Sequence, residues 1–300
     1  MNCHCVKNQK DYLPALGKMI ATTNIAGLLR FAYHELLETD QNPELDAQVL
    51  LSHLLNKPRS WLFAHPEYCP DPQIVLDFQD CLAKLQDGYP LSYLTGKREF
   101  YGLSFQVTND VLVPRPETEL LVEHAIGWLK HHPQVTDAID IGTGSGCIAA
   151  ALAKNCPQLS IIAVDISPKA LQVAVRNFED HGVEPKVHPV CSDLCSCLSG
   201  TFHLVCANLP YIPSFELSSL SVSRFEPHLA LDGGRNGLDK IHRLLIDSSR
   251  WFVSPGLMLL EIHEIYGYEV QTLAANHYPS ANIDIINDYA DRSRLVRIEI

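Results

Sequence analysis

The chain of 300 residues contains 46% hydrophobic and 8% aromatic residues, which is typical of a folded globular protein and excludes an intrinsically disordered one. The formal net charge of −12 at pH 7 argues against a protein that wraps a nucleic-acid backbone, because neutralising phosphates requires clustered lysine and arginine. No apolar stretch approaches the roughly 20 residues of a membrane span, and the first residues lack the apolar core of a signal peptide. We therefore expect a cytoplasmic protein without a membrane partner.

Ten cysteines raise the question of a metal site. Cys3 and Cys5, and the three cysteines within residues 191–197, are clustered, but neither group has the paired C-x2-C spacing of structural zinc. Others, such as Cys147 and Cys206, lie in apolar runs, where free cysteine behaves as a small hydrophobic residue. We predict reduced cysteines and no metal site.

The N-terminal part of the chain has a helical pattern. Residues 1–23 carry little periodicity and are predicted to be a weakly ordered extension. Apolar residues then recur at helical spacing in three segments that begin near Ile25, Pro43 and Pro72. No strand pattern interrupts them, so residues 24–90 are predicted to form a small helical domain.

Residues 91–114 are predicted to be a linker that contains a β-hairpin. Two apolar segments, residues 100–107 and 111–113, flank the turn-forming residues 108–110. Residues 114–117, Pro-Arg-Pro-Glu, then interrupt the strand pattern and start a helix.

Strands and helices alternate through the rest of the chain, residues 115–300. Short apolar runs of the kind that form buried strands occupy residues 138–141, 160–164, 186–190, 203–207, 257–262, 283–286 and 295–300. Helical patterns lie between several of them, at residues 148–154, 168–179 and 237–252. This alternation predicts an α/β domain with a mostly parallel sheet, helices on both faces and a paired final strand.

A glycine-rich turn, Asp140-Ile-Gly-Thr-Gly-Ser-Gly146, follows the first of these strands. Its glycines allow a tight turn and a close approach to a ligand, and Asp165 ends the next strand, where a carboxylate can accept both hydroxyls of a ribose. The third glycine falls one residue too early for a dinucleotide fingerprint, and Asp140 suits a cofactor with a cationic amino group. We predict S-adenosyl-L-methionine (AdoMet), with a dinucleotide or a ligand-free turn as alternatives.

Asp193 and Leu194 follow the third strand. The carboxylate can accept a hydrogen bond from an adenine amine while Leu194 packs on the ring, and a solvated turn is the alternative. The predicted cofactor-binding residues are Asp140, Gly142, Thr143, Gly144, Ser145, Gly146, Asp165, Asp193, Leu194 and Asn208.

The tetrapeptide Asn208-Leu-Pro-Tyr211 follows the fourth strand, at the sheet edge where α/β folds bind ligands. Asn208 offers an amide oxygen, Pro210 favours an extended conformation at Leu209 that directs the Leu209 carbonyl, and Tyr211 adds a flat ring. Two acceptors and a ring suit a planar NH2 group, such as a carboxamide or the exocyclic amine of a base. A proline-containing turn with an asparagine cap is the alternative.

Six motifs occur in order along the chain. They are Pro90-Leu-Ser-Tyr-Leu-Thr-Gly-Lys-Arg-Glu-Phe100, Val113-Pro-Arg-Pro-Glu-Thr-Glu119, Asp140-Ile-Gly-Thr-Gly-Ser-Gly146, Asn208-Leu-Pro-Tyr-Ile-Pro213, Phe225-Glu-Pro-His-Leu-Ala-Leu231 with Gly233-Gly234, and Asp288-Tyr-Ala-Asp-Arg-Ser-Arg294. Together they resemble the release-factor glutamine N5-methyltransferases, the PrmC/HemK family. The resemblance runs from about Ile25 to the C-terminus.

The resemblance implies a class I AdoMet-dependent methyltransferase domain. Such a domain is Rossmann-like, with a mostly parallel seven-stranded sheet whose last strand is antiparallel, and it follows the helical domain and the hairpin linker. The implied cofactor is S-adenosyl-L-methionine, and the implied substrate is the glutamine of the GGQ motif in class I peptide chain release factors. We expect a monomer that binds no nucleic acid directly.

The predicted catalytic residues are Asn208, Leu209, Pro210 and Tyr211. The Asn208 side-chain oxygen and the Leu209 carbonyl are expected to accept the two N–H bonds of the substrate amide. Tyr211 and Phe100 are expected to pack against that amide, and Arg115 to hold the linker against the site. These six residues form the predicted substrate-binding set.

The chain departs from the family pattern at two places. Leu209 stands where the family has the first proline of N-P-P-Y, and N-L-P-Y also occurs in rRNA dimethyladenosine methyltransferases. After the fifth strand, His263 replaces a glycine and Tyr266 replaces a glutamine. A nucleic-acid amino methyltransferase, acting on adenine N6 or cytosine N4 with Tyr211 stacked on a flipped base, is the competing function. A non-enzymatic AdoMet-binding module is the third.

Overall fold

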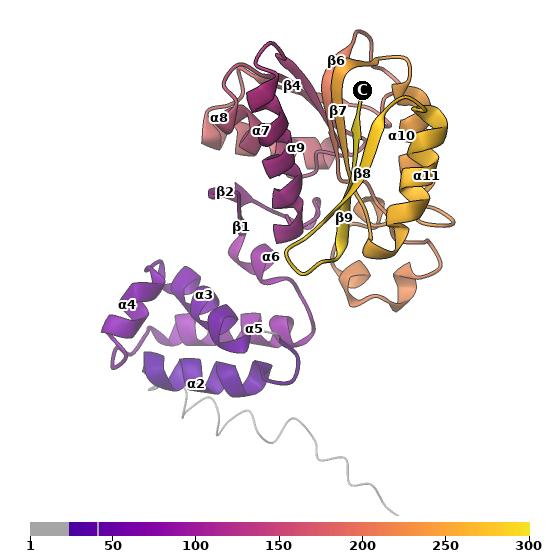
Figure 1. The fold of residues 1–300 in the computed structure, drawn as a ribbon. Helices are drawn as coiled ribbons and strands as arrows, with labels where there is room; N and C mark the ends of the chain where they lie inside the picture. The colour runs from indigo at the N-terminus through magenta and orange to yellow at the C-terminus, as the bar shows by residue number, and fades with distance from the viewer. Residues whose placement is uncertain (1–23, 41) are drawn as a thin grey trace, which may run out of the picture. The chain divides into compact units, whose positions relative to one another are not determined.

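The structure, a computed structural model, describes residues 24–40 and 42–300. The chain divides between Thr95 and Gly96 into two compact units (Figure 1). One hydrophobic cluster lies in the first unit and two lie in the second. The predicted extension 1–23, with Cys3 and Cys5, lies outside the described residues. Within the described part of the chain, the helices are too short or too polar to cross a membrane.

The first unit is a bundle of helices, as predicted. The three predicted helices are α2 (Ile25–Leu36), α3 (Pro43–Leu55) and α5 (Pro72–Gln86), and the short helices α4 (Arg59–Ala64) and α6 (Leu91–Thr95) were not predicted. Asn24 caps α2 by accepting a hydrogen bond from the Gly27 N–H at 3.0 Å. The helices share one apolar core that includes Leu28, Leu50 and Phe78.

The second unit begins with a β-hairpin, but its turn is not where the sequence pattern placed it. Strand β1 (Lys97–Phe100) pairs antiparallel with β2 (Leu103–Gln106), so Tyr101 and Gly102 form a two-residue turn. Their φ angles of +50° and +73° match the left-handed turns that join twisted strands. Residues 108–110, predicted as the hairpin turn, instead follow β2 in a loop that the Val111 N–H closes onto the Thr108 carbonyl at 3.1 Å.

A seven-stranded sheet forms the centre of the second unit. Its strands are β3 (Asp137–Ile141), β4 (Ser160–Asp165), β5 (Val187–Cys191), β6 (Phe202–Ala207), β7 (Phe252–Glu261), β8 (Asn282–Asn287) and β9 (Ser293–Glu299). Their order in the sheet is β5-β4-β3-β6-β7-β9-β8, and β9 alone runs opposite to the six other strands. The predicted mostly parallel sheet with an antiparallel last strand is confirmed.

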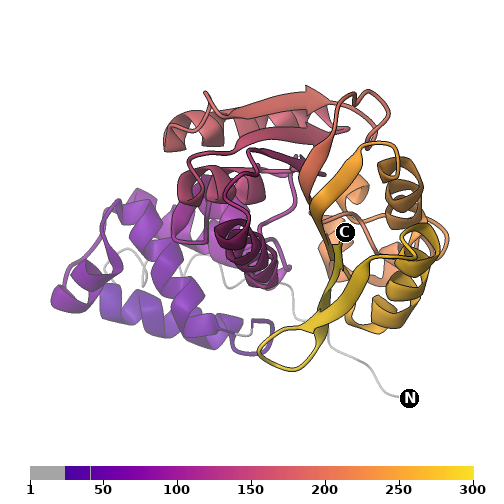
Figure 2. The same ribbon diagram turned by 45° about the horizontal axis from the view of Figure 1, so that its top comes forward.

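Helices cover both faces of this sheet (Figure 1 and Figure 2). The helices α7 (Glu119–His131), α8 (Cys147–Asn155) and α9 (Pro168–His181) share one core with one face, and α10 (Asp239–Ser248) and α11 (Gly267–His277) share a second core with the other. Helix α11 was not predicted, and α10 ends earlier than predicted because the chain enters β7 at Phe252. Side chains of β6 alternate between the two cores, since Leu204 lies in the first and Val205 in the second.

The strand order reverses beside β3. The chain goes from β3 outward to β4 and β5, and then returns to place β6 on the other side of β3. In open α/β sheets, ligands bind at the carboxyl ends of the strands at such a reversal. The glycine-rich turn after β3 and the Asn208 tetrapeptide after β6 therefore lie at the two sides of this point.

Candidate cofactor and methyl-acceptor site

The glycine-rich turn is held in a conformation that only glycine adopts without strain. Gly142 and Gly146 have φ angles of +77° and +81°. A Cβ built on Gly142 would lie 3.2 Å from the Leu209 Cδ2 atom, and one on Gly146 would lie 2.5 Å from the Phe178 ring. The turn thus packs directly against the loop after β6 on one side and helix α9 on the other.

Asp165 connects the turn to the next strand. Its two carboxylate oxygens accept backbone hydrogen bonds from Gly144 at 2.9 Å and Ser167 at 2.8 Å, and the residue lines a cavity beside the turn. Burial raises the pKa of its carboxyl above the ordinary value, against these hydrogen bonds. A carboxylate has about four acceptor sites and the backbone donors do not use all of them, so Asp165 can still accept a hydroxyl group from a ligand in the cavity.

Asp140 lies beneath the turn, fully buried, and does not line the cavity. Its Oδ2 accepts a hydrogen bond from the Thr143 hydroxyl at 2.6 Å, and its Oδ1 has no hydrogen-bond partner among the described residues. Burial raises the pKa of this carboxyl to about 7. Asp140 therefore shapes the turn through Thr143 and presents one unused acceptor beneath it.

The predicted cofactor-binding residues mostly meet at one cavity. Those that line it are Gly142, Thr143, Gly144, Ser145, Asp165, Asp193, Leu194 and Asn208, whereas Gly146 and Asp140 support the turn from behind. Asp193 is also ion-paired, because the Arg243 Nη1 atom donates to its Oδ2 at 2.7 Å. No local sequence pattern indicates this partner, which lies 50 residues away on α10.

The loop after β6 lines the same cavity with Asn208, Leu209 and Pro210. The Leu209 side chain is buried in the second core, so its backbone is held firmly at the cavity wall. Tyr211 lies beside the cavity, with its ring centroid 6.0 Å from that of His263, and burial raises its pKa to about 12. Its phenol is therefore neutral at physiological pH.

Two residues that the sequence did not single out lie against Asn208. The Asn208 Nδ2 atom donates to the Thr118 hydroxyl at 3.2 Å. Glu261 ends β7, where Leu260 pairs with Ala207, so its carboxyl lies beside the residue that follows β6. This carboxyl is buried, and the hydrogen-bonding groups of the nearby Thr118 and Asn208 side chains lower its pKa against the effect of burial. Only the pairing of β6 with β7 could have identified Glu261.

The P-R-P-E-T-E segment is tied to two distant segments. The Arg115 Nη2 atom donates to the Glu226 Oε1 atom at 2.6 Å, and the Val113 N–H donates to its Oε2 atom at 3.1 Å. Glu226 is buried, whereas Arg115 reaches the cavity wall. This pair joins the chain before α7 to the loop that follows the Asn208 tetrapeptide.

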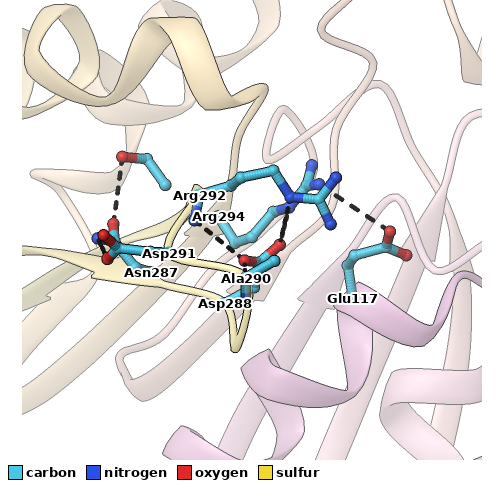
Figure 3. A network of polar contacts seen from close by, with 8 residues as sticks. Glu117, Asn287, Asp288, Ala290, Asp291, Arg292 and Arg294 are labelled. Carbon is cyan, nitrogen blue, oxygen red and sulfur yellow. Dashed lines mark hydrogen bonds and ion pairs between the residues drawn. The ribbon is translucent and has the colours of Figure 1, made fainter.

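The second connection comes from the turn between β8 and β9 (Figure 3). The Arg294 Nε atom donates to the Asp288 Oδ2 atom at 2.9 Å, and its Nη2 atom lies 4.0 Å from the Glu117 Oε1 atom. Arg292 also donates to Asp288, at 3.1 Å. The C-terminal motif therefore places a cation beside Glu117.

Family models and curated relatives match this chain in sequence. The chain matches the PrmC N-terminal domain over residues 27–96 and the methyltransferase small domain over residues 116–225. The release factor glutamine methyltransferase of Rhodopirellula baltica is 37% identical over 86% of this chain and 90% of its own length. That of Moorella thermoacetica is 39% identical over 85% and 90%, and that of Escherichia coli is 34% identical over 86% and 93%. The chain belongs to the release factor glutamine methyltransferase (PrmC/HemK) family.

Solved structures confirm the fold of the second unit. The hMettl16 catalytic domain, in complex with MAT2A 3'UTR hairpin 6, has a TM-score of 0.53 and 14% sequence identity, covering 75% of this chain and 81% of that one. This likeness identifies the class I methyltransferase fold. Membership in the release factor glutamine methyltransferase family makes S-adenosyl-L-methionine the cofactor.

The cavity of this family member fits that cofactor. AdoMet carries a ribose, an adenine and a cationic amino end, and no phosphate. Asp165 and Asp193 are acceptors at the cavity wall, Leu194 is apolar, and the Gly142 backbone leaves no side chain in the way. The Oδ1 atom of Asp140, beneath the turn, has no hydrogen-bond partner among the described residues.

One predicted substrate contact is corrected. Phe100 is 1% exposed and lies in the first core, where its ring packs against Phe105 with 6.1 Å between centroids. It does not line the cavity. The reason is the position of the hairpin turn, because Phe100 is the last residue of β1 and faces inward opposite Leu103. Glu119 anchors this turn by accepting the Tyr101 N–H at 2.9 Å.

Proposed function

We propose that this release factor glutamine methyltransferase methylates the side-chain amide nitrogen, N5, of the glutamine in the GGQ motif of class I peptide chain release factors. The observation that carries the proposal is that Asn208 and Leu209 line the same cavity as Asp165 and the glycine-rich turn. A methyl donor and an amide acceptor can therefore meet there. Because release factors act in translation, we place the protein in the cytoplasm.

The role of the acceptor loop follows from the chemistry of an amide. A carboxamide nitrogen is a poor nucleophile because its lone pair is delocalised into the carbonyl group. AdoMet, when bound, supplies an electrophilic methyl group. The protein must hold the amide nitrogen in line with it, and such orientation can lower the barrier by up to roughly 7–11 kcal/mol.

Asn208 and Leu209 provide this orientation. The Asn208 Oδ1 atom and the Leu209 carbonyl accept the two N–H bonds of the substrate amide. Both acceptors also stabilise the positive charge that develops on the nitrogen during transfer. Pro210 stiffens the backbone after Leu209, and the neutral ring of Tyr211 packs against the planar amide.

A substrate-labelling experiment tests the proposed function. Purified protein and tritiated AdoMet are incubated with release factor, with release factor whose GGQ glutamine is replaced by alanine, and with RNA or DNA. Label is expected in the unmodified release factor alone. Label in nucleic acid would favour the amino methyltransferase of bases instead, and label in the alanine variant would contradict the assigned acceptor.

A variant tests the role of the acceptor loop. Asn208→Ala removes one acceptor from a buried donor, which costs about 1–3 kcal/mol and corresponds to a rate loss of roughly 5- to 150-fold. The matched control is Asn282→Ala, at the exposed start of β8, where the rate is expected to stay unchanged. An Asn208→Ala protein with the rate of the control would refute the assigned role.

A further inference from the structure

A buried carboxyl group lies behind the acceptor loop, at the end of the strand next to it. Glu261 is 3% exposed, and the nearby Thr118 hydroxyl and Asn208 amide lower the pKa of its carboxyl against the rise that burial causes. Its Oε2 atom has no hydrogen-bond partner among the described residues. A buried carboxyl with an unused oxygen costs stability, and the proposed function as described does not use it.

The charge state of Glu261 determines which end of the Asn208 amide points towards it. The Asn208 Nδ2 atom donates to the Thr118 Oγ1 atom at 3.2 Å, and the single hydroxyl hydrogen of Thr118 is then free to be donated to Glu261. An ionised carboxylate only accepts hydrogen bonds, so it selects the amide orientation that turns the NH2 group towards it. The Asn208 Oδ1 atom is thereby directed away from Glu261.

We propose that Glu261 is a positioning residue, which fixes the orientation of the Asn208 amide through direct and Thr118-mediated hydrogen bonds. This inference rests on the proposed function, in which the Asn208 Oδ1 atom accepts an N–H bond of the substrate glutamine. Glu261 does not contact that glutamine. It determines whether Asn208 presents an oxygen or an NH2 group to it.

The protonation state of Glu261 then controls the orientation. Burial raises the pKa of its carboxyl to about 7, and Glu117 raises it further, whereas the hydrogen bonds from Thr118 and Asn208 and the nearby Arg294 lower it. Cys147 and Tyr211 also interact electrostatically with Glu261, but burial raises the pKa of each to about 12, so both are neutral near pH 7.

A protonated Glu261 has an O–H group to donate. It no longer selects against the flipped amide, in which Asn208 Oδ1 accepts that hydrogen and the NH2 group faces the substrate. The flipped amide offers no acceptor to the substrate N–H. The rate of methyl transfer should therefore fall as the pH falls through about 7.

The first test is the dependence of kcat on pH for methyl transfer to release factor. Glu261→Gln keeps the side-chain shape, but its amide can donate or accept, so it no longer selects one Asn208 orientation. We expect kcat to fall roughly 10-fold or more and to lose its rise between about pH 6 and pH 8, with the dissociation constant for AdoMet unchanged. The control Glu184→Gln removes an exposed carboxylate in the loop between α9 and β5 and should keep the wild-type profile.

Two variants of Thr118 separate the hydrogen bond from packing. Thr118→Ser retains the hydroxyl and should keep most of kcat, whereas Thr118→Val retains the shape without the hydroxyl and should lose it. Equal rates for the two variants would contradict the mediated contact. A Glu261→Gln protein that keeps the wild-type pH profile would overturn the proposal for Glu261. A fully active Asn208→Ala protein would instead refute the proposed function, on which the proposal for Glu261 rests.

A spectroscopic measurement does not depend on turnover. In the full-length protein with AdoMet, the side-chain amide signals of Asn208, assigned by their loss in Asn208→Ala, should shift between about pH 6 and pH 8. They should not shift in Glu261→Gln. If that variant fails to fold, the wild-type titration still decides, because signals that stay constant over this range would overturn the proposal.

Discussion

The packing of the glycine-rich turn against α9 predicts a large loss of stability for Gly146→Ala. The backbone at Gly146 has a φ of +81°, and a non-glycine residue in this region costs about 1–2 kcal/mol. The new Cβ would also lie 2.5 Å from the Phe178 ring and 3.1 Å from the Ala174 Cβ atom, and such overpacking costs about 1–3 kcal/mol more. We expect the free energy of unfolding to fall by about 2–5 kcal/mol.

Helix α9 offers a matched control. Gly182 ends this helix with a φ of +61°, but a Cβ built there meets no atom within 4 Å. Gly182→Ala should therefore lose only the backbone contribution, about 1–2 kcal/mol. Both variants are measured by urea unfolding. Gly146→Ala is also measured in a Phe178→Leu protein, which removes the ring that the new Cβ would meet. In that background Gly146→Ala should become less destabilising by about 1 kcal/mol or more. Equal losses for the two glycines, unaffected by Phe178→Leu, would refute the packing argument.

Two further predictions concern buried carboxyl groups. Arg115→Met removes the cation that pairs with the buried Glu226, so the Val113 N–H is the remaining donor to that carboxyl among the described residues. Urea unfolding should show a loss of about 1–3 kcal/mol in the free energy of unfolding. The double variant Arg115→Met with Glu226→Gln should recover part of this loss. Asp140 has a pKa of about 7 in the folded protein, above its value in the unfolded chain. Between about pH 4 and pH 7 the folded state therefore binds more protons than the unfolded state, so the contribution of Asp140 makes stability decline as the pH rises. Unfolding midpoints of Asp140→Asn should decline less over this range, and a slope equal to that of the wild type would contradict the raised pKa.

Local patterns were sufficient for most of the second unit. Buried parallel strands leave continuous apolar runs, as in residues 203–207, and glycine-rich turns leave short signatures, as in residues 140–146. Both features are properties of neighbouring residues. Helix α11 was missed because its N-cap is Tyr266, which makes no capping hydrogen bond among the described residues, and because Gly267, a poor helix former, opens its first turn.

The hairpin was misplaced for a related reason. The pair Tyr101-Gly102 lies inside a run of apolar and aromatic residues, so it resembled strand, whereas residues 108–110 have the composition of a turn. The pairing of Arg98 with Phe105 decides the true register. With the turn at Tyr101, Phe100 becomes a core residue and leaves the set of substrate contacts.

The sequence by itself determined the family, the sheet and the residues that follow each strand, because these depend on local periodicity and on short motifs. The tertiary structure decided which distant groups share a hydrogen bond. Glu261 meets Asn208 only because β6 pairs with β7, and Thr118 meets both only because the segment before α7 closes over the strand ends. Such contacts join residues that are 53 to 143 positions apart (261 − 208 and 261 − 118), and no local pattern records them. The acceptor tetrapeptide could therefore be found in the sequence, whereas the carboxyl that orients it could be found only in the fold.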